Sequence, residues 1–187
     1  MLFLTNQGRV YRLKGYQVPE GSRTAKGSHI VNLLQLQEGE KVTLMLQQKA
    51  DVDEDNTYAT MVTKQGLIKR TPLSQFRNIR KAGLIAIALN EGDSLVWSHL
   101  TKGDDEIIVA THDGAAIHFT EDGARSMGRT GHGVRVIKLR EGDYVVGAGV
   151  CRPGATVLTI SEEGKGRRSR IDDYRITNRG GKGVKTI

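Results

Sequence analysis

The feature that most constrains this chain is an internal repeat, marked by a four-residue turn sequence that recurs along its whole length. Turns of the pattern Thr/Ser-x-x-Gly recur at a long interval, at Thr5–Gly8, Thr63–Gly66, Thr111–Gly114 and Ser161–Gly164. The glycines that end these turns are separated by 58, 48 and 50 residues. Self-similarity at such a period is typical of arrays in which one supersecondary unit is repeated and stacked on its neighbour.

Two further marks keep the same order and nearly the same spacing. A second glycine follows each turn after 17 to 19 residues, at Gly27, Gly83, Gly133 and Gly183. An acidic Glu-Gly-Asp/Glu triplet then follows in the first three units, at 38–40, 91–93 and 141–143. We therefore interpret residues 1–187 as one repeat domain with units of about 1–50, 51–103, 104–153 and 154–187, the last of them incomplete.

Short apolar or alternating runs lie between these marks, and they predict β-strands. The turn glycines suit hairpin loops, because glycine adopts positive φ without steric cost. No window shows a sustained 3.6-residue apolar period, so helices are expected to be minor. The strands predicted for the second and third units are 58–62, 67–70, 84–89, 95–99, 106–110, 115–119, 134–139 and 144–150. About four strands in about 50 residues is the size of a propeller blade, so the predicted fold is all-β, a propeller-like array of four-stranded blades.

Composition excludes several classes of protein. A single cysteine, Cys151, forms neither a disulfide framework nor a cysteine-based zinc site. Hydrophobic residues make up 37% and charged residues 26%, which argues against a membrane protein and against a disordered acidic tail. The apolar N-terminal run stops at Thr5, short of the ~7–15 apolar residues of a signal peptide. We expect a soluble, cytoplasmic chain with no membrane partner.

Positive charge is concentrated at one place in each repeat. The chain has 28 Lys and Arg against 21 Asp and Glu, a formal net charge of +7. The segments that run from each first glycine to each second glycine hold 19 of these basic residues but only 5 of the acidic ones. If the repeats are arranged radially, these segments form a curved basic belt. Such a belt can follow and neutralise a phosphate backbone, with an affinity set by counterion release.

The belt favours duplex over single-stranded nucleic acid. Aromatic residues make up only 5% of the chain, whereas single strands are held mainly by aromatic stacking platforms. The third unit is the weakest sector, because its segment offers Arg125 and Arg129 with His118 and His132. A solvated surface explains an isolated charged run equally well, but enrichment of the same segment in three units of four favours a polyanion-binding face.

No motif in the chain predicts catalysis or a bound nucleotide. Gly181-Lys182 is followed by Gly183 instead of Ser or Thr, so it is not a P-loop. The five histidines lack metal-ligand spacing, and the adjacent acid pairs fall in predicted loops. Cys151 is expected to be a buried or edge thiol, and Trp97 and Phe76 are expected in the core.

The stretch Thr177–Gly183 interleaves three glycines with Arg179 and Lys182. It predicts a tight, exposed loop whose backbone amides and cations face a phosphate together. Similar loops occur at 23–27 and 129–133. A simple glycine-rich hairpin turn is compatible with the same residues, and both descriptions can hold.

Several long strings resemble the C-terminal domain of the gyrase A protein of bacterial DNA gyrase, and the resemblance covers essentially the whole chain. The strings are residues 8–14, 22–27, 69–76, 83–89 and 174–186. The resemblance implies a β-pinwheel, a propeller variant in which neighbouring blades exchange a strand. It also implies a role in wrapping duplex DNA around a basic perimeter, so that the whole ATP-dependent topoisomerase introduces negative supercoils.

The same resemblance implies which partners the chain has, and that it needs no cofactor and performs no catalysis of its own. The expected partners are duplex DNA, the remainder of gyrase A in its homodimer, and gyrase B, close to the nucleoid. This chain is expected to be non-catalytic and to need no cofactor, with ATP and Mg²⁺ serving only the whole enzyme. The family usually has six repeats, of which this chain would hold about four.

The family's signature loop is Gln-Arg/Lys-Arg-Gly-Gly-Arg/Lys-Gly. Its last five positions are matched by Arg179, Gly180, Gly181, Lys182 and Gly183, whereas Thr177 and Asn178 replace the first two. We interpret residues 177–183 as a degenerate copy of this loop, and we expect the complete copy upstream of Met1.

We predict that the cations of the basic belt contact phosphates, and we expect removal of Lys69 and Arg70 to flatten the salt dependence of binding. The full predicted set is Arg9, Arg12, Lys14, Arg23, Lys26, Lys69, Arg70, Arg80, Lys81, Arg129, Lys165, Arg167, Arg168, Arg170, Arg179 and Lys182. One alternative is the related domain of the A-type protein of topoisomerase IV. The other alternative, of a different class, is a propeller that acts as a protein-interaction scaffold, which predicts apolar or mixed-charge patches and little salt dependence.

Overall fold

The computed structural model describes residues 1–186, and nearly all of its regular structure is β-strand, which confirms the predicted fold class. The strands are β1 (Leu2–Thr5), β2 (Arg9–Arg12), β3 (Val42–Leu46), β4 (Tyr58–Thr63), β5 (Leu67–Pro72), β6 (Leu84–Ile85), β7 (Leu95–Thr101), β8 (Glu106–Thr111), β9 (Ala115–Thr120), β10 (Val134–Arg135), β11 (Val145–Val150), β12 (Thr156–Ile160), β13 (Gly166–Arg170) and β14 (Val184–Lys185). Short 3-10 turns are η1 (Gly15–Gln17), η2 (Ile30–Asn32), η3 (Leu73–Phe76), η4 (Glu121–Gly123) and η5 (Ile171–Asp173). No helix among these residues is long and apolar enough to cross a membrane.

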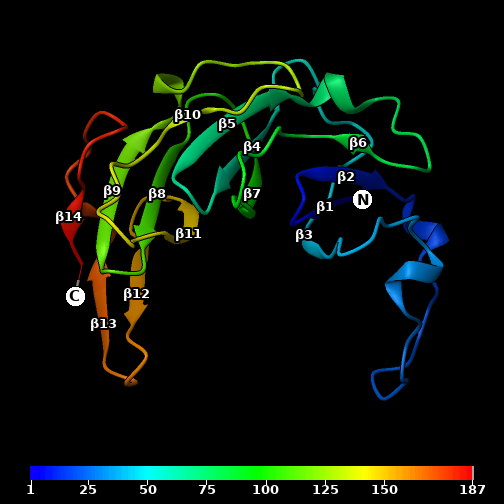
Figure 1. Cartoon of the computed structure of the whole chain (residues 1–187), viewed down its shortest axis with the longest axis horizontal. Coiled ribbons are helices and arrows are strands. Elements are labelled where there is room, and N and C mark those ends of the chain that lie inside the picture. Colours follow the sequence, from blue (N-terminus) through cyan, green and yellow to red (C-terminus); the bar gives the residue numbers. More distant parts are fainter. Residues whose placement is uncertain (187) are drawn as a thin grey trace.

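The strands form four antiparallel sheets that follow one another along an open arc (Figure 1). The strand orders are β3-β1-β2-β6, β10-β5-β4-β7, β11-β8-β9-β14 and β12-β13. Three blades therefore have the predicted four strands, and the fourth sheet is a single hairpin within the described residues. The arc places the first sheet and the last hairpin at opposite ends of the molecule (Figure 1).

Each of the first three sheets is completed by a strand from the following repeat. β6 of the second unit pairs with β2 of the first, and β10 of the third unit pairs with β5 of the second. β14 of the fourth unit pairs with β9 of the third in the same way. This is the strand exchange that the resemblance to a pinwheel implies, and it ties consecutive blades together through backbone hydrogen bonds.

The exchanged strands are shorter than the sequence predicts. Apolar runs at 84–89 and 134–139 predict strands throughout, but only two residues of each run pair, as β6 and β10. The chain then leaves the ladder: the N–H groups of Ala86 and Ile87 both donate to the carbonyl of Gly8, at 2.8 and 3.1 Å. Ala86 and Ile87 are buried between two blades, so the apolar run reflects burial rather than continued pairing.

Marker glycines lie at the strand-exchange joints. Gly133 and Gly183 have φ of +99° and +72°, in the left-handed region. A Cβ at Gly133 would lie 2.7 Å from the carbonyl oxygen of Ile68, and one at Gly183 would lie 2.5 Å from that of Ala116. Any side chain there would collide with the backbone of the neighbouring blade, so the repeated glycine is required by the close approach of two chains.

Carboxylates of the Glu-Gly-Asp/Glu triplets stabilise the Thr-x-x-Gly turn of their own repeat by accepting hydrogen bonds from it. Asp93 Oδ1 accepts the N–H of Gln65 at 2.9 Å, and Asp143 Oδ1 accepts the N–H of Asp113 at 3.0 Å. Glu40 of the first unit is buried and accepts two side-chain hydroxyl hydrogen bonds, both at 2.7 Å. These carboxylates are therefore committed to the fold.

The two largest hydrophobic clusters lie between neighbouring blades, and a smaller one around Phe3 and Tyr11 lies within the first unit. One buried cluster combines Leu2 and Leu4 of the first unit with Met61 and Leu73 of the second. A second cluster joins the next two units in the same way. It combines Val62 and Ile68 of the second unit with Ile107 and Val109 of the third. Phe76 is buried in the first cluster, as predicted, and Trp97 packs against the second while only partly buried.

Gly133→Ala is expected to lower the free energy of unfolding by more than Gly27→Ala does. Both glycines have positive φ, +99° and +71°, so both substitutions carry the left-handed penalty of about 1–2 kcal/mol. Only at Gly133 does the new Cβ meet backbone, since nothing lies within 4 Å of a Cβ at Gly27. The forced displacement adds about 1–3 kcal/mol. Urea unfolding of the two variants measures the difference, and equal losses would contradict the close-approach role.

Candidate nucleic-acid interface

The sixteen cations predicted to contact phosphates fall into two groups with different surroundings. One group is exposed: Lys14, Arg23, Lys26, Arg80, Lys81, Lys165, Arg167, Arg168, Arg170 and Lys182. The other group is half-buried or buried: Arg9, Arg12, Lys69, Arg70, Arg129 and Arg179. The second group contains the cations that take part in joining the repeats.

Basic side chains four residues after a turn glycine bind the next repeat, and we call these contacts the inter-repeat latches. In each latch the side chain donates to a backbone carbonyl ten residues after the turn glycine of the following unit. The latches are Arg12 Nη2 to Phe76 O at 2.9 Å, Arg70 Nε to Ala124 O at 2.5 Å and His118 Nδ1 to Tyr174 O at 2.7 Å. The same hydrogen bond is thus made at three successive junctions.

The inter-repeat latches leave a pattern in the sequence, but a count of basic residues does not distinguish it from a pattern of DNA contacts. The position four residues after each turn glycine is basic in all four units, as Arg12, Arg70, His118 and Arg168. Arg70 also donates from Nη1 to the carbonyl of Gly103 at 2.9 Å. The guanidinium groups of Arg12 and Arg70 therefore serve the junctions, and the regular spacing of these two cations reflects the fold.

Lys69 does not fit the predicted phosphate contact, because its side chain is fully buried. It is 0% exposed, and Nζ donates to the carbonyl of Ala86 at 2.6 Å and to the carbonyl of Arg129. Burial, and then the nearby charge of Arg129, lower the pKa of the ammonium group to about 7. Lys69 bridges segments of the second and third units, and its removal is no test of DNA binding.

The glycine-rich loop at 177–183 is less open than the sequence predicts. Arg179 donates from Nε to Gly123 O at 2.6 Å and from Nη1 to Arg135 O at 3.0 Å. The N–H of Gly180 donates to Val136 O at 2.6 Å. Arg179 and this amide are therefore held by the third unit, and Lys182 is the loop cation that stays exposed. Arg9 is engaged in a similar way, by the carbonyl of Ala82 and by Glu40 at 3.6 Å.

The densest group of exposed cations lies on and beside β13, and consists of Lys165, Arg167, Arg168 and Arg170. Two of them form exposed ion pairs, Lys165 with Glu163 at 2.9 Å and Arg170 with Asp172 at 3.4 Å. Such pairs contribute about 0–1 kcal/mol, so a phosphate displaces them at little cost. The side chains of Arg167 and Arg168 make no hydrogen bond or ion pair within residues 1–186.

The other exposed cations lie toward the opposite end of the arc. Lys14, Arg23 and Lys26 belong to the arm of residues 14–29 that projects beyond the first sheet (Figure 1). Arg80 and Lys81 lie in the loop that precedes β6. The exposed predicted contacts are therefore concentrated in the first, second and fourth units, and the third unit keeps the low density that its sequence indicates.

The described residues offer little for catalysis. Residues 1–186 contain no group of three or more His, Cys, Asp or Glu placed to hold a metal ion. Cys151 is half-buried, and burial, with a smaller effect of Glu106, raises the pKa of its thiol to about 12. A thiol of such high pKa is a poor nucleophile at neutral pH. The arrangement is suited to binding an extended anion.

The low pKa of Lys69 predicts a pH dependence of stability. Between pH 7 and 10.5 the unfolded chain holds a proton that folded Lys69 has largely released, so stability rises with pH, by at most about 1.4 kcal/mol per pH unit. Lys69→Met removes this group and is expected to flatten the rise. Urea unfolding from pH 7.5 to 9.5 measures the free energy of unfolding of the native protein and of the variant. An equal rise with pH in both proteins would contradict the lowered pKa of Lys69.

A family model described as "DNA gyrase C-terminal domain, beta-propeller" matches the chain at residues 1–49, 58–102, 105–152 and 155–187. The chain is also 44% identical over 188 residues to the gyrase A protein of Staphylococcus aureus DNA gyrase. That alignment covers 100% of this chain and 21% of the relative. The chain thus spans about a fifth of the length of the curated relatives that it matches.

Two solved structures show the same architecture over 98% of this chain, each at 26% sequence identity. The C-terminal domain of DNA topoisomerase IV superposes with a TM-score of 0.88, and the match covers 57% of that chain. The DNA gyrase A C-terminal domain superposes with a TM-score of 0.79, and the match covers 58% of that chain. Together with the repeats and the exchanged strands, these matches show that the chain belongs to the DNA gyrase C-terminal domain family.

Proposed function

We propose that this chain binds duplex DNA through the exposed cations of its arc and bends the duplex along that arc. The observation that carries the proposal is the division of charge: ten of the predicted contacts stay exposed after folding, whereas acids of the repeat marks are used to hold turns. Membership in the DNA gyrase C-terminal domain family supports the same function.

The mechanism rests on a stiff curved scaffold that presents cations along its length. Exchanged strands and inter-repeat latches fix each blade against the next, so the curvature of the arc is maintained when DNA binds. Bending 20–30 base pairs through 40–90° costs about 1–6 kcal/mol, which one surface cation cannot offset. Several contacts along the arc, each releasing counterions from the DNA, supply the required free energy together.

For the whole protein we propose a DNA-wrapping role within a gyrase. The chain would act with the remainder of a gyrase A protein, in a homodimer, and with gyrase B, in the cytoplasm beside the nucleoid. The DNA-cleaving tyrosine, ATP and Mg²⁺ would belong to other parts of the enzyme, and this domain would be non-catalytic. Its contribution would be to present a wrapped DNA segment to the gate, so that strand passage introduces negative supercoils.

A topoisomerase IV protein is the second candidate, favoured by the TM-score of 0.88 to the C-terminal domain of that enzyme against 0.79 to that of gyrase A. The two solved domains do not differ in identity, since each is 26% identical to the chain. We favour gyrase because the family model is that of the DNA gyrase C-terminal domain and the chain is 44% identical to the gyrase A protein of S. aureus.

Replacing Arg167 and Arg168 by Gln is expected to weaken binding to duplex DNA of every sequence. Loss of two phosphate contacts lowers the slope of log K against log salt by about 2. The matched control is Lys49→Gln with Lys102→Gln, which removes the same charge from two exposed residues outside the belt. Binding titrations over a salt series measure the slopes. Salt-independent binding by the native protein would contradict the proposed function, and equal slopes for the two variants would remove β13 from the interface.

A further inference from the structure

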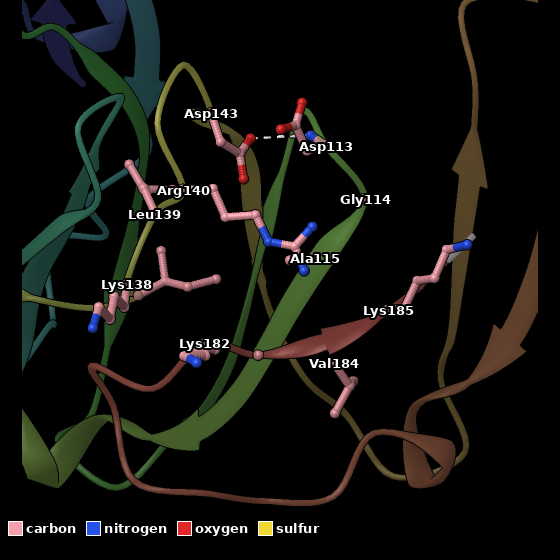
Figure 2. Close-up of a pocket in the computed structure, with 12 residues that line it drawn as sticks. Asp113, Gly114, Ala115, Lys138, Leu139, Arg140, Asp143, Lys182, Val184 and Lys185 are labelled. Carbon is pink, nitrogen blue, oxygen red and sulfur yellow. Dashed lines mark hydrogen bonds between the residues drawn. The ribbon is translucent and has the colours of Figure 1, made fainter.

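A pocket of about 560 Å³ at the junction of the third and fourth units is lined by four cations (Figure 2). Lys138 and Arg140 come from the segment that follows β10, and Lys182 and Lys185 come from the end of the chain around β14. Figure 2 shows Arg140 reaching across the pocket toward the turn that carries Gly114. Three of these four cations lie outside the predicted set of phosphate contacts.

Backbone hydrogen bonds between the third and fourth units fix the walls of this pocket. The N–H of Lys138 donates to the carbonyl of Gly181 at 2.7 Å, and the N–H of Thr186 donates to the carbonyl of Gly114 at 2.8 Å. The loop that carries Lys182 is held further by the bond from Gly180 to Val136. The four cations therefore stand on a scaffold that is formed before any ligand binds, which reduces the entropy lost on binding.

The pocket carries an excess of positive charge. Its lining holds four cations and two carboxylates, Asp113 and Asp143, and in Figure 2 Arg140 extends across the pocket whereas Lys185 points away from it. Asp143 Oδ1 is already committed, because it accepts the N–H groups of Asp113 and Tyr144 at 3.0 and 2.8 Å. The side chains of Lys138, Arg140, Lys182 and Lys185 make no hydrogen bond or ion pair with any residue from 1 to 186.

The preceding junction shows that the fold does not need a cation at the positions of Lys138 and Arg140. There the corresponding pocket, of about 390 Å³, is lined by Gln65 and Asn90, and its cations are Arg135 and Lys138. Asn90 stands seven residues after the second glycine mark, as Arg140 does one repeat later, and Ala88 stands at the position of Lys138. The joint is therefore built with Ala88 and Asn90 at one junction and with Lys138 and Arg140 at the next, whereas Arg135 and Lys185 supply a cation at the equivalent position of both.

We propose that this pocket is a phosphate-binding site that holds a phosphodiester of the bound duplex, outside the predicted belt. The proposal rests on the proposed function. A phosphate group matches an excess of two positive charges, and the planar guanidinium of Arg140 can donate two parallel hydrogen bonds to its oxygens. The contact would add a fixed point for the DNA beside the third unit, where the belt itself is sparse.

The test compares Lys138→Gln with Arg140→Gln, as a double variant, with the control pair Lys49→Gln and Lys102→Gln. Both double variants remove two exposed positive charges, and neither touches the predicted belt. The pocket variant is expected to lower the slope of log K against log salt by about 1 to 2, since each lost phosphate contact removes about 0.9. Thermal unfolding checks that both variants stay folded.

Each outcome has a distinct meaning. A pocket variant with the slope of the control overturns the phosphate site and leaves the proposed function standing. Salt-independent binding by the native protein overturns both proposals. A titration with inorganic phosphate, followed by amide NMR shifts, separates the two sources of phosphate. Saturating shifts around Gly114 and Gly183 without any effect of the pocket variant on DNA binding would assign the pocket to a free phosphate and contradict the DNA contact.

Discussion

The structure depends on how closely the backbone of one repeat approaches that of the next. At each strand-exchange joint the incoming chain lies so near the neighbouring blade that a Cβ at Gly133 or Gly183 would meet a carbonyl oxygen at 2.7 or 2.5 Å. Glycine is therefore required at these joints, and its recurrence produces the repeat visible in the sequence. Because the exchanged segments pass between blades, the two largest hydrophobic clusters form at the junctions, each built from residues of two units.

The cations of the chain serve two purposes that charge alone does not distinguish. Between neighbouring units, carbonyl groups at the 3-10 turns η3 and η4 accept hydrogen bonds from Arg12 and Arg70, and the carbonyl of Ala86 after β6 accepts one from Lys69. A buried carbonyl without a donor would cost about 1–3 kcal/mol, so these positions select basic side chains for the fold itself. The exposed cations do not join the repeats. They are free to attract an anion, and they lie on a scaffold whose curvature is fixed by the strand-exchange joints.

The sequence predicts the architecture well because the constraint that produces it is local and repeated. Turn glycines, acidic caps and alternating strands appear in order in each unit, and the resemblance to the gyrase A domain adds the exchanged strand. The sequence is less informative about individual side chains. Lys69 and Lys165 occur in similar basic segments, yet one is buried against carbonyls of another unit and the other is exposed. Such contacts join residues about 17 to 60 positions apart, and no local pattern reports them. Lys138 and Arg140 could not be predicted from the sequence for the same reason, because only the folded joint brings them into one pocket with Lys182.

If a stiff basic arc bends the DNA that it binds, the two ends of a bound duplex must move toward one another. A duplex of about 150 base pairs, close to one persistence length, would carry a fluorescent donor at one end and an acceptor at the other. The distance between the dyes would be measured while the protein is titrated to saturation at low salt. Our account predicts that the ends approach one another as binding proceeds, and that they separate again when salt releases the protein. Saturated, salt-sensitive binding with the ends unmoved would contradict it, because the arc would then hold DNA without imposing its curvature.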